Sequence, residues 1–412
     1  MNVKVFQFNG CDKCFNESLL LMEEDNLSVE LITDLENWKE EEFDIAVITG
    51  YLLPENETML MKIFNNSEKI IAYGSCPSTG GIYGLANQKG FDVTPIDKLI
   101  SDSSAIHGCL ANIEDLKNTI SNNGSDKPQL LCTVCKRKST CDYLDEVHRQ
   151  IELEDKETCF NDLGFLCNGY VSAECKEKCI NYETQCRGCT PIVERPGIRM
   201  LGMFGTLMGN IEVATEASKY GATDKLADKD DDITKSLPDI VGNFFRFSLP
   251  SSGLPKGRIP AKGSLLENVF VGRLIEELPL ITGLLGGTKS ISLTLNAIES
   301  YEKDAEIDIS EETKNYRKEL RTLEKKLEKA VEDKDVKAYK ETTENIRKIA
   351  GNMNLSNVFF GGFKTPIKED DSFDNYKPHV FEIMEGNYKD SIIEYSLDSE
   401  GVINEIKLKE GK

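Results

Sequence analysis

The residues of this 412-residue chain best suited to chemistry are its thirteen cysteines. All of them lie between positions 11 and 189, and the stretch "ECKEKCINYETQCRGC", residues 174–189, holds four. Thiolates are ligands for iron–sulfur clusters and for zinc, and thiols can also pair as disulfides. The distribution therefore predicts sulfur-based metal sites or a disulfide framework in one half of the chain.

The composition favours metal ligation over disulfides. Disulfide frameworks are typical of small secreted domains, whereas this chain is long enough for two or three domains and is 39% hydrophobic. Its first residues enter a strand pattern without a secretory signal, and it has no apolar run of about 18 residues that could span a bilayer. The net charge of -22 argues against nucleic-acid and anionic-membrane binding. We expect an acidic cytoplasmic protein.

Residues 1–125 show the pattern of an α/β domain. The β-rich runs "VKVFQF", "LSVELI", "FDIAVITG" and "KIIAYG" are separated by helical patterns such as "ETMLMKIFNNS". This rhythm predicts a flavodoxin-like, doubly wound parallel sheet. The loops after its strands should converge at one edge of the sheet, and they carry Cys11, Cys14, Cys76 and Cys109.

The other nine cysteines lie in residues 126–255, which contain few long apolar runs. We expect this domain to fold around its metals. Its last part, "SLPDIVGNFFRFSLPSSGLP" (residues 236–255), fits two interpretations equally well, a segment that covers a partner and a core loop of this chain.

Residues 256–412 form a C-terminal extension without cysteine. A helical hairpin is predicted over residues 310–352, starting at Ser310, and a β-hairpin near the end turns at residues 399–401. Dense charges are typical of solvated arms or partner contacts, so we expect the hairpin to be dispensable for cluster assembly but needed for a partner contact. Its narrow apolar seam consists of Leu320, Leu323, Leu327 and Val331.

The cysteine spacing leaves zinc and iron–sulfur clusters open. Two C-x2-C pairs, Cys132/Cys135 and Cys186/Cys189, would alone suit a zinc ribbon. Twelve cysteines, however, divide into three sets of four, as three cubane clusters require. None of the three histidines pairs with the cysteines, so a Rieske centre is not expected. The count and the sheet-edge set favour iron–sulfur clusters.

Several motifs resemble, in their order and spacing, the small subunit of cytoplasmic nickel–iron hydrogenases. The nearest likeness is to the archaeal methyl-viologen-reducing, deazaflavin-reducing and sulfhydrogenase group, and it covers roughly residues 1–255. Two departures stand out: Phe15 follows the second cysteine, where the family commonly has an acidic residue, and "HGCLA" replaces Pro-Gly-Cys-Pro-Pro. The motifs are "GCDKC", "GSCPSTGG", "HGC", "CTVC", "CFNDLGFLCNG", "CKEKCINYETQCRGCTP" and "IVGNFFRFSLPSS".

The resemblance implies an electron-transfer subunit of an anaerobic oxidoreductase with three 4Fe–4S clusters. Its partners would be a large subunit that holds the nickel–iron site and an acceptor subunit: heterodisulfide reductase, or a deazaflavin- or nicotinamide-linked flavoprotein. Cys141 is left over from the implied ligand sets. These sets are Cys11, Cys14, Cys76 and Cys109 for the proximal cluster; Cys175, Cys179, Cys186 and Cys189 for the medial cluster; and Cys132, Cys135, Cys159 and Cys167 for the distal cluster.

Glu17 is the candidate proton relay beside the first cysteine pair, because "CFNES" resembles the family's Cys-acid-x-Ser with one residue inserted. Two other hypotheses stay open. One is a hydrogenase-like iron–sulfur subunit of another redox complex without hydrogen activity, which the two departures favour. The other is a zinc-stapled scaffold protein.

Overall fold

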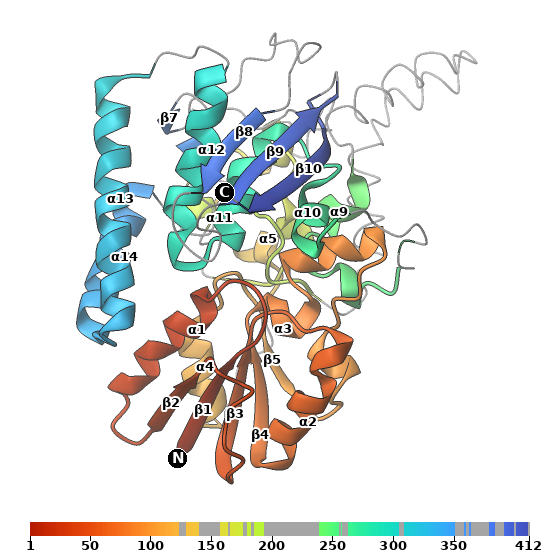
Figure 1. Ribbon diagram of the computed structural model, residues 1–412, viewed down its shortest axis with the longest axis vertical. Helices are drawn as coiled ribbons and strands as arrows, with labels where there is room; N and C mark the ends of the chain where they lie inside the picture. Colours follow the sequence, from red (N-terminus) through yellow and green to blue (C-terminus); the bar gives the residue numbers. More distant parts are fainter. Residues whose placement is uncertain are drawn as a thin grey trace.

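A five-stranded, entirely parallel sheet in the order β2-β1-β3-β4-β5 organises the N-terminal part of the chain (Figure 1). This order is that of flavodoxin-like folds and confirms the predicted doubly wound sheet. The structure is a computed structural model. It describes residues 1–122, 129–139, 157–163, 165–175, 179–182, 185–192, 239–254, 257, 263–304, 309–350, 358–359, 362–363, 379–383, 391–398 and 401–410.

Four of the five strands coincide with the apolar runs of the sequence. The fifth has only three residues, which is too short to show a periodicity. The strands are β1 (Asn2–Gln7), β2 (Ser28–Ile32), β3 (Phe43–Thr49), β4 (Ser67–Tyr73) and β5 (Ser104–Ile106).

Helices cover both faces of this sheet. On one face, Leu60 and Ile63 of α2 pack with Phe6 and Ile48. The other face is covered by α4 and by η1, which follows α1 directly. The bounds are α1 (Lys13–Glu17), η1 (Ser18–Glu23), η2 (Pro54–Asn56), α2 (Glu57–Asn65), α3 (Ser75–Thr79), η3 (Ile82–Lys89), η4 (Ile96–Lys98) and α4 (Ile113–Ile120).

The described parts of the cysteine-rich segment contain only short helices. Buried Leu131, Phe160, Phe165 and Ile180 form a small apolar cluster together with cysteines. The elements are α5 (Leu131–Val134), η5 (Asn161–Leu163), η6 (Asn168–Val171) and η7 (Ile180–Tyr182).

The C-terminal part lies above the carboxyl ends of the parallel strands and combines helices with a small antiparallel sheet, β10-β9-β8 (Figure 1). Its helices are α9 (Ile240–Phe244), η8 (Leu249–Ser251), α10 (Leu265–Phe270), η9 (Ile275–Glu277), α11 (Leu278–Leu285), η10 (Gly287–Lys289), α12 (Ser290–Asp304), α13 (Glu311–Glu332) and α14 (Val336–Ala350). Its strands are β6 (Val358–Phe359), β7 (Gly362–Phe363), β8 (His379–Ile383), β9 (Ser391–Leu397) and β10 (Ile403–Glu410).

The charged segment after Ser310 forms α13 and α14, which lie side by side (Figure 1). Leu320, Leu323 and Leu327 are buried, and they belong to the same apolar cluster as Leu19 of η1. The hairpin is therefore not a fully solvated arm, whereas the partner contact expected of it stays a prediction. Helix periodicity identified the apolar seam, but its contact with the N-terminal part depends on tertiary packing.

Leu327 offers a test of this packing, because its side chain is only 1% exposed. Replacing it by alanine should lower the free energy of unfolding by roughly 2–5 kcal/mol, since the change removes buried methyl groups and leaves a cavity. Urea denaturation measures the difference. The matched control is Glu319→Ala, at an exposed position of the same helix, which should change stability by no more than about 0.5 kcal/mol. Equal, small effects of both variants would contradict the packing.

Candidate metal centre

Four cysteines lie in loops at the carboxyl ends of three parallel strands. Cys11 and Cys14 follow β1, Cys76 lies in α3 directly after β4, and Cys109 follows β5. Carboxyl ends of parallel strands are where α/β sheets bind their ligands. The structure thus brings together the sheet-edge cysteines that the sequence predicted.

Hydrogen bonds and one glycine keep these loops close. The Ser75 N–H donates to the Gly108 carbonyl at 3.0 Å, and the Gly108 N–H donates to Ser75 Oγ at 2.9 Å. Gly74 has a φ of +103°, and a Cβ added there would lie 2.8 Å from Cys14 Sγ. Any side chain at position 74 would collide with the thiol, so the glycine permits the close approach.

The thiols of this set influence one another. Burial raises the pKa of Cys109 well above its ordinary range, and the negative charges of Cys76, Cys11, Cys189 and Cys14 raise it further. Four thiolates cannot share a buried place without a compensating cation, whereas iron provides that positive charge when thiolates ligate it. The donor set is therefore chemically suited to a cationic metal core.

The cysteines of the implied distal set are also neighbours. Burial raises the pKa of Cys132 to about 12, and the charges of Cys167, Cys159 and Cys135 contribute to the rise. A Cβ added to Gly169 would meet both Cys132 Sγ, at 3.3 Å, and Cys167 Sγ, at 3.6 Å. Residues far apart in the sequence thus bring their thiols to one place.

The implied medial set is close to the distal one. Burial raises the pKa of Cys179 well above its ordinary range, and the charges of Cys189 and Cys175 add to the effect. Burial raises the pKa of Cys186 well above its ordinary range, and the charges of Cys167, Cys179 and Cys189 raise it further. The Cys186 N–H donates to Cys167 Sγ at 3.3 Å. Cys167 therefore lies where the two sets meet.

One hydrogen bond joins the medial set to the sheet edge: the Ser75 hydroxyl donates to the Cys189 carbonyl. Since Cys189 also acts on Cys109, the first set adjoins the medial set, which in turn adjoins the distal set through Cys167. The thiols form a continuous series across the described part of the molecule.

The donor chemistry of all three sets fits iron–sulfur clusters, because thiolates are the ligands that such clusters require and each set provides four. Within the described ranges, no three His, Cys, Asp or Glu side chains are close enough to hold one metal ion. A cubane differs from a single ion because its four thiolates bind four separate irons, so its ligands lie further apart. No disulfide joins any two of the twelve cysteines that the structure describes. Cys141 lies outside the described residues.

Glu17 is buried beside the C-terminal hairpin. The Tyr339 hydroxyl of α14 donates to Glu17 Oε2 at 2.9 Å, and Arg347 Nη2 lies 3.8 Å from Glu17 Oε1. Burial and then the Glu17 charge raise the pKa of Tyr339 well above its ordinary range, so the phenol stays protonated and donates. Phe15, at the position of the family's acid, is buried in the core on one face of the sheet. The carboxyl group is thus enclosed between two segments 322 residues apart.

The loop between the first two cysteines is held by the same extension. Lys13 Nζ donates to the Gly283 carbonyl at the end of α11 at 2.7 Å, and the Thr288 N–H donates to Asp12 Oδ1 at 3.0 Å. Lys13 is 5% exposed, and burial lowers its pKa while the charges of Cys11 and Cys109 oppose the change. The structure thus places a cation at the first set.

A second buried cation, Arg187, lies beside the medial set in the "RGC" motif. Burial and, as the second cause, the nearby charge of Arg246 lower the pKa of Arg187 to about 10. The charges of Glu277 and Cys179 act in the opposite direction. Positive charge near a cluster is one of the factors that set its potential. The motif is visible in the sequence, but its spacing alone does not indicate this role for the arginine.

The aromatic segment of residues 239–254 packs against other parts of this chain. The Thr79 hydroxyl donates to the Phe247 carbonyl at 2.7 Å, and a Cβ added to Gly80 would lie 2.3 Å from Pro250 Cγ. For the described residues 239–254, the structure therefore supports the core-loop interpretation, and the segment supports the Cys76 loop.

Comparisons with known proteins agree with these features. Residues 7–122 match the family described as NADH ubiquinone oxidoreductase, 20 Kd subunit. A subunit of the F420-non-reducing hydrogenase of Methanothermobacter marburgensis is 24% identical over 299 residues, which cover 60% of this chain and 93% of that protein. The iron-sulfur subunit of the F420-non-reducing hydrogenase of Archaeoglobus profundus is 24% identical over 284 residues, 54% of this chain and 84% of that protein.

A solved structure described as NAD+-reducing [NiFe]-hydrogenase in the H2-reduced state matches with a TM-score of 0.26 and 20% identity. The match covers 31% of this chain and 95% of that chain. Among the helices that the structure describes, none has the length and hydrophobicity needed to cross a membrane.

Proposed function

Because the chain carries a domain of the NADH ubiquinone oxidoreductase 20 Kd subunit family and is related to subunits of F420-non-reducing hydrogenases, we propose that it is the electron-transfer small subunit of a nickel–iron hydrogenase. The observation that carries the proposal is the continuous series of thiols from Cys109 through Cys189 to Cys167. The relationship itself identifies a subunit of an oxidoreductase complex. Its location would be cytoplasmic.

In this proposal the three sets of four cysteines each hold one 4Fe–4S cluster. When bound, the clusters supply one-electron carriers whose potentials depend on nearby charge, hydrogen bonds and exposure. Lys13 would act on the first set and Arg187 on the medial set, each as a buried cation. Ser75 would hold the proximal and medial sets in a fixed relative position through its hydrogen bonds to Gly108 and Cys189. The neighbourhood of the thiols supports the proximal, medial and distal assignment.

The partners would be a large subunit that holds the nickel–iron site and an acceptor subunit. Glu17 would pass protons near the first set, and its carboxylate oxygen accepts a hydrogen bond from Tyr339. Residues 1–125 would form the first functional domain, residues 126–255 would hold the medial and distal clusters, and residues 256–412 would support both. The contacts of Asp12, Lys13 and Glu17 with the extension favour this supporting role.

The test is metal analysis of the anaerobically purified protein. We expect about twelve irons and twelve acid-labile sulfides, the content of three cubanes, and a nickel-containing partner that co-purifies. About four of each would contradict the three-cluster assignment. Abundant zinc without sulfide would instead identify the zinc-stapled scaffold.

A second candidate function is electron transfer in a redox complex without hydrogen activity. Two observations favour it: Phe15 occupies the position of the family's acid, and α14 encloses Glu17. The two functions differ in whether nickel accompanies the complete complex. Full iron content with a partner that lacks nickel would establish this candidate.

A further inference from the structure

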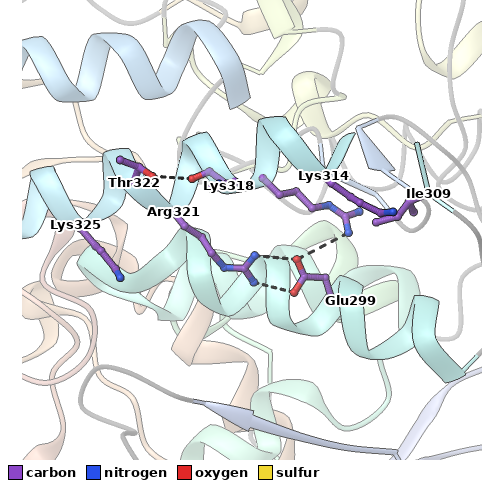
Figure 2. Close-up of a pocket in the computed structure, with 8 residues that line it drawn as sticks. Glu299, Ile309, Lys314, Lys318, Arg321, Thr322 and Lys325 are labelled. Atoms are coloured by element: carbon purple, nitrogen blue, oxygen red, sulfur yellow. Dashed lines mark hydrogen bonds and ion pairs between the residues drawn. The ribbon is translucent and has the colours of Figure 1, made fainter. Parts of the chain in front are cut away.

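A basic pocket lies between α12 and α13 (Figure 2). Its volume is about 390 Å³, which is within the range of small-molecule sites. Of the eight described residues that line it, five are basic, and all five belong to α13. The lining residues are Glu299, Ile309, Lys314, Arg317, Lys318, Arg321, Thr322 and Lys325.

The positive charge is concentrated by the geometry of α13. The basic residues recur every three or four positions, so they lie on one face of the helix. Two of the helix's carboxylates have other contacts: Glu324 is buried and accepts from the Ile291 N–H at 2.7 Å, and Glu328 pairs with Lys289. Glu311 lies on the basic face, 2.6 Å from Lys314 Nζ. In a chain of net charge -22, this cationic face is an exception.

One carboxylate organises the arginines of the pocket. Glu299 of α12 accepts two hydrogen bonds from Arg321, each 2.8 Å long (Figure 2). Arg317 Nη1 lies 4.0 Å from the same carboxylate. A bidentate pair of this kind holds a guanidinium in one orientation. Lys318 and Lys325 are exposed at the same pocket, so they can contact a ligand without breaking the Glu299 pairs.

We propose that this pocket binds the phosphate groups of a small phosphorylated molecule. Lysine and arginine donors suit phosphate oxygens, whereas the Thr322 hydroxyl already donates to the Lys318 carbonyl at 2.8 Å. Among the described lining residues none is aromatic and one, Ile309, is aliphatic, so these residues offer recognition of a di- or polyphosphate group rather than a stacking surface for a base. A concave pocket of this size also suits a small anion better than the acidic surface of a protein. The proposal goes beyond the proposed electron-transfer function and does not depend on it.

The test uses the full chain, with its clusters as purified, and inorganic pyrophosphate as the probe. Isothermal titration calorimetry in a phosphate-free buffer should show saturable binding of about one pyrophosphate per chain. The pocket variant Lys318→Ala/Lys325→Ala should weaken this binding by at least about tenfold, because each lysine would donate a charge-assisted hydrogen bond to the anion.

A matched control carries the same loss of charge. Lys326→Ala/Lys329→Ala removes two lysines of the same helix that do not line the pocket, and its affinity should stay within about twofold of the parent's at 0.15 M salt, where charges at the surface are screened. Circular dichroism confirms that both variants keep their helices. No saturable binding to the parent chain, or equal losses in both variants, would overturn the proposal. Tighter binding of a glutamate-rich peptide than of pyrophosphate would overturn the ligand class.

Discussion

Replacing Cys109 by serine is expected to remove about four of about twelve iron atoms from the anaerobically purified protein. Cys109 lies close to the rest of its set, since the charges of Cys76, Cys11 and Cys14 all act on its thiol. Serine is a poor ligand for this soft metal site, so the first cluster should be lost. Iron and acid-labile sulfide analysis measures the change.

Two further variants make this result specific. Cys186→Ser should also remove about four irons but from the medial set, whereas Cys141→Ser should leave the iron content unchanged, because Cys141 is the one cysteine outside the proposed sets. Loss of all iron from Cys109→Ser would show that the sets do not assemble independently. Loss of iron from Cys141→Ser would assign that residue to a cluster and would revise the distal set.

The second large effect is expected at Glu17. Glutamine keeps the shape of the side chain but cannot exchange a proton, so Glu17→Gln should lower hydrogen turnover of the assembled complex by roughly 100-fold or more. Its cluster content should not change. Turnover is measured with the chain bound to its nickel-containing partner, and iron analysis of the same preparation checks the clusters.

Glu23 offers a matched control for this substitution. Its carboxylate lies 3.4 Å from Lys340 Nζ of α14, so both glutamates contact the same helix, but Glu23 is far less buried than Glu17: their side chains are 39% and 7% exposed. Glu23→Gln should leave turnover unchanged. Unchanged turnover in Glu17→Gln would show that protons leave by another route. No turnover in the parent complex with intact clusters would favour the function without hydrogen.

Short-range patterns in the sequence predicted the parts of the fold that depend on neighbours along the chain. The run "KIIAYG" identifies β4, and Cys76 follows it within three residues. Since strand periodicity and loop position are local properties, the convergence of the first four cysteines could be expected from the sequence. Cysteine spacing also carried the resemblance to the hydrogenase small subunits, whereas the series of thiols from Cys109 to Cys167 became visible only in the structure.

Tertiary structure alone decided what surrounds the first cysteine loop. Lys13 meets Gly283 and Glu17 meets Tyr339, and these pairs are separated by 270 and 322 residues. A helix pattern shows which face of α13 or α14 is apolar but not which surface that face will cover. Charge density therefore suggested a solvated arm, whereas burial of Leu327 against the rest of the chain fixed the hairpin over Glu17. The pocket between α12 and α13 arises for the same reason, because Glu299 and the basic face of α13 become neighbours only when the two helices pack.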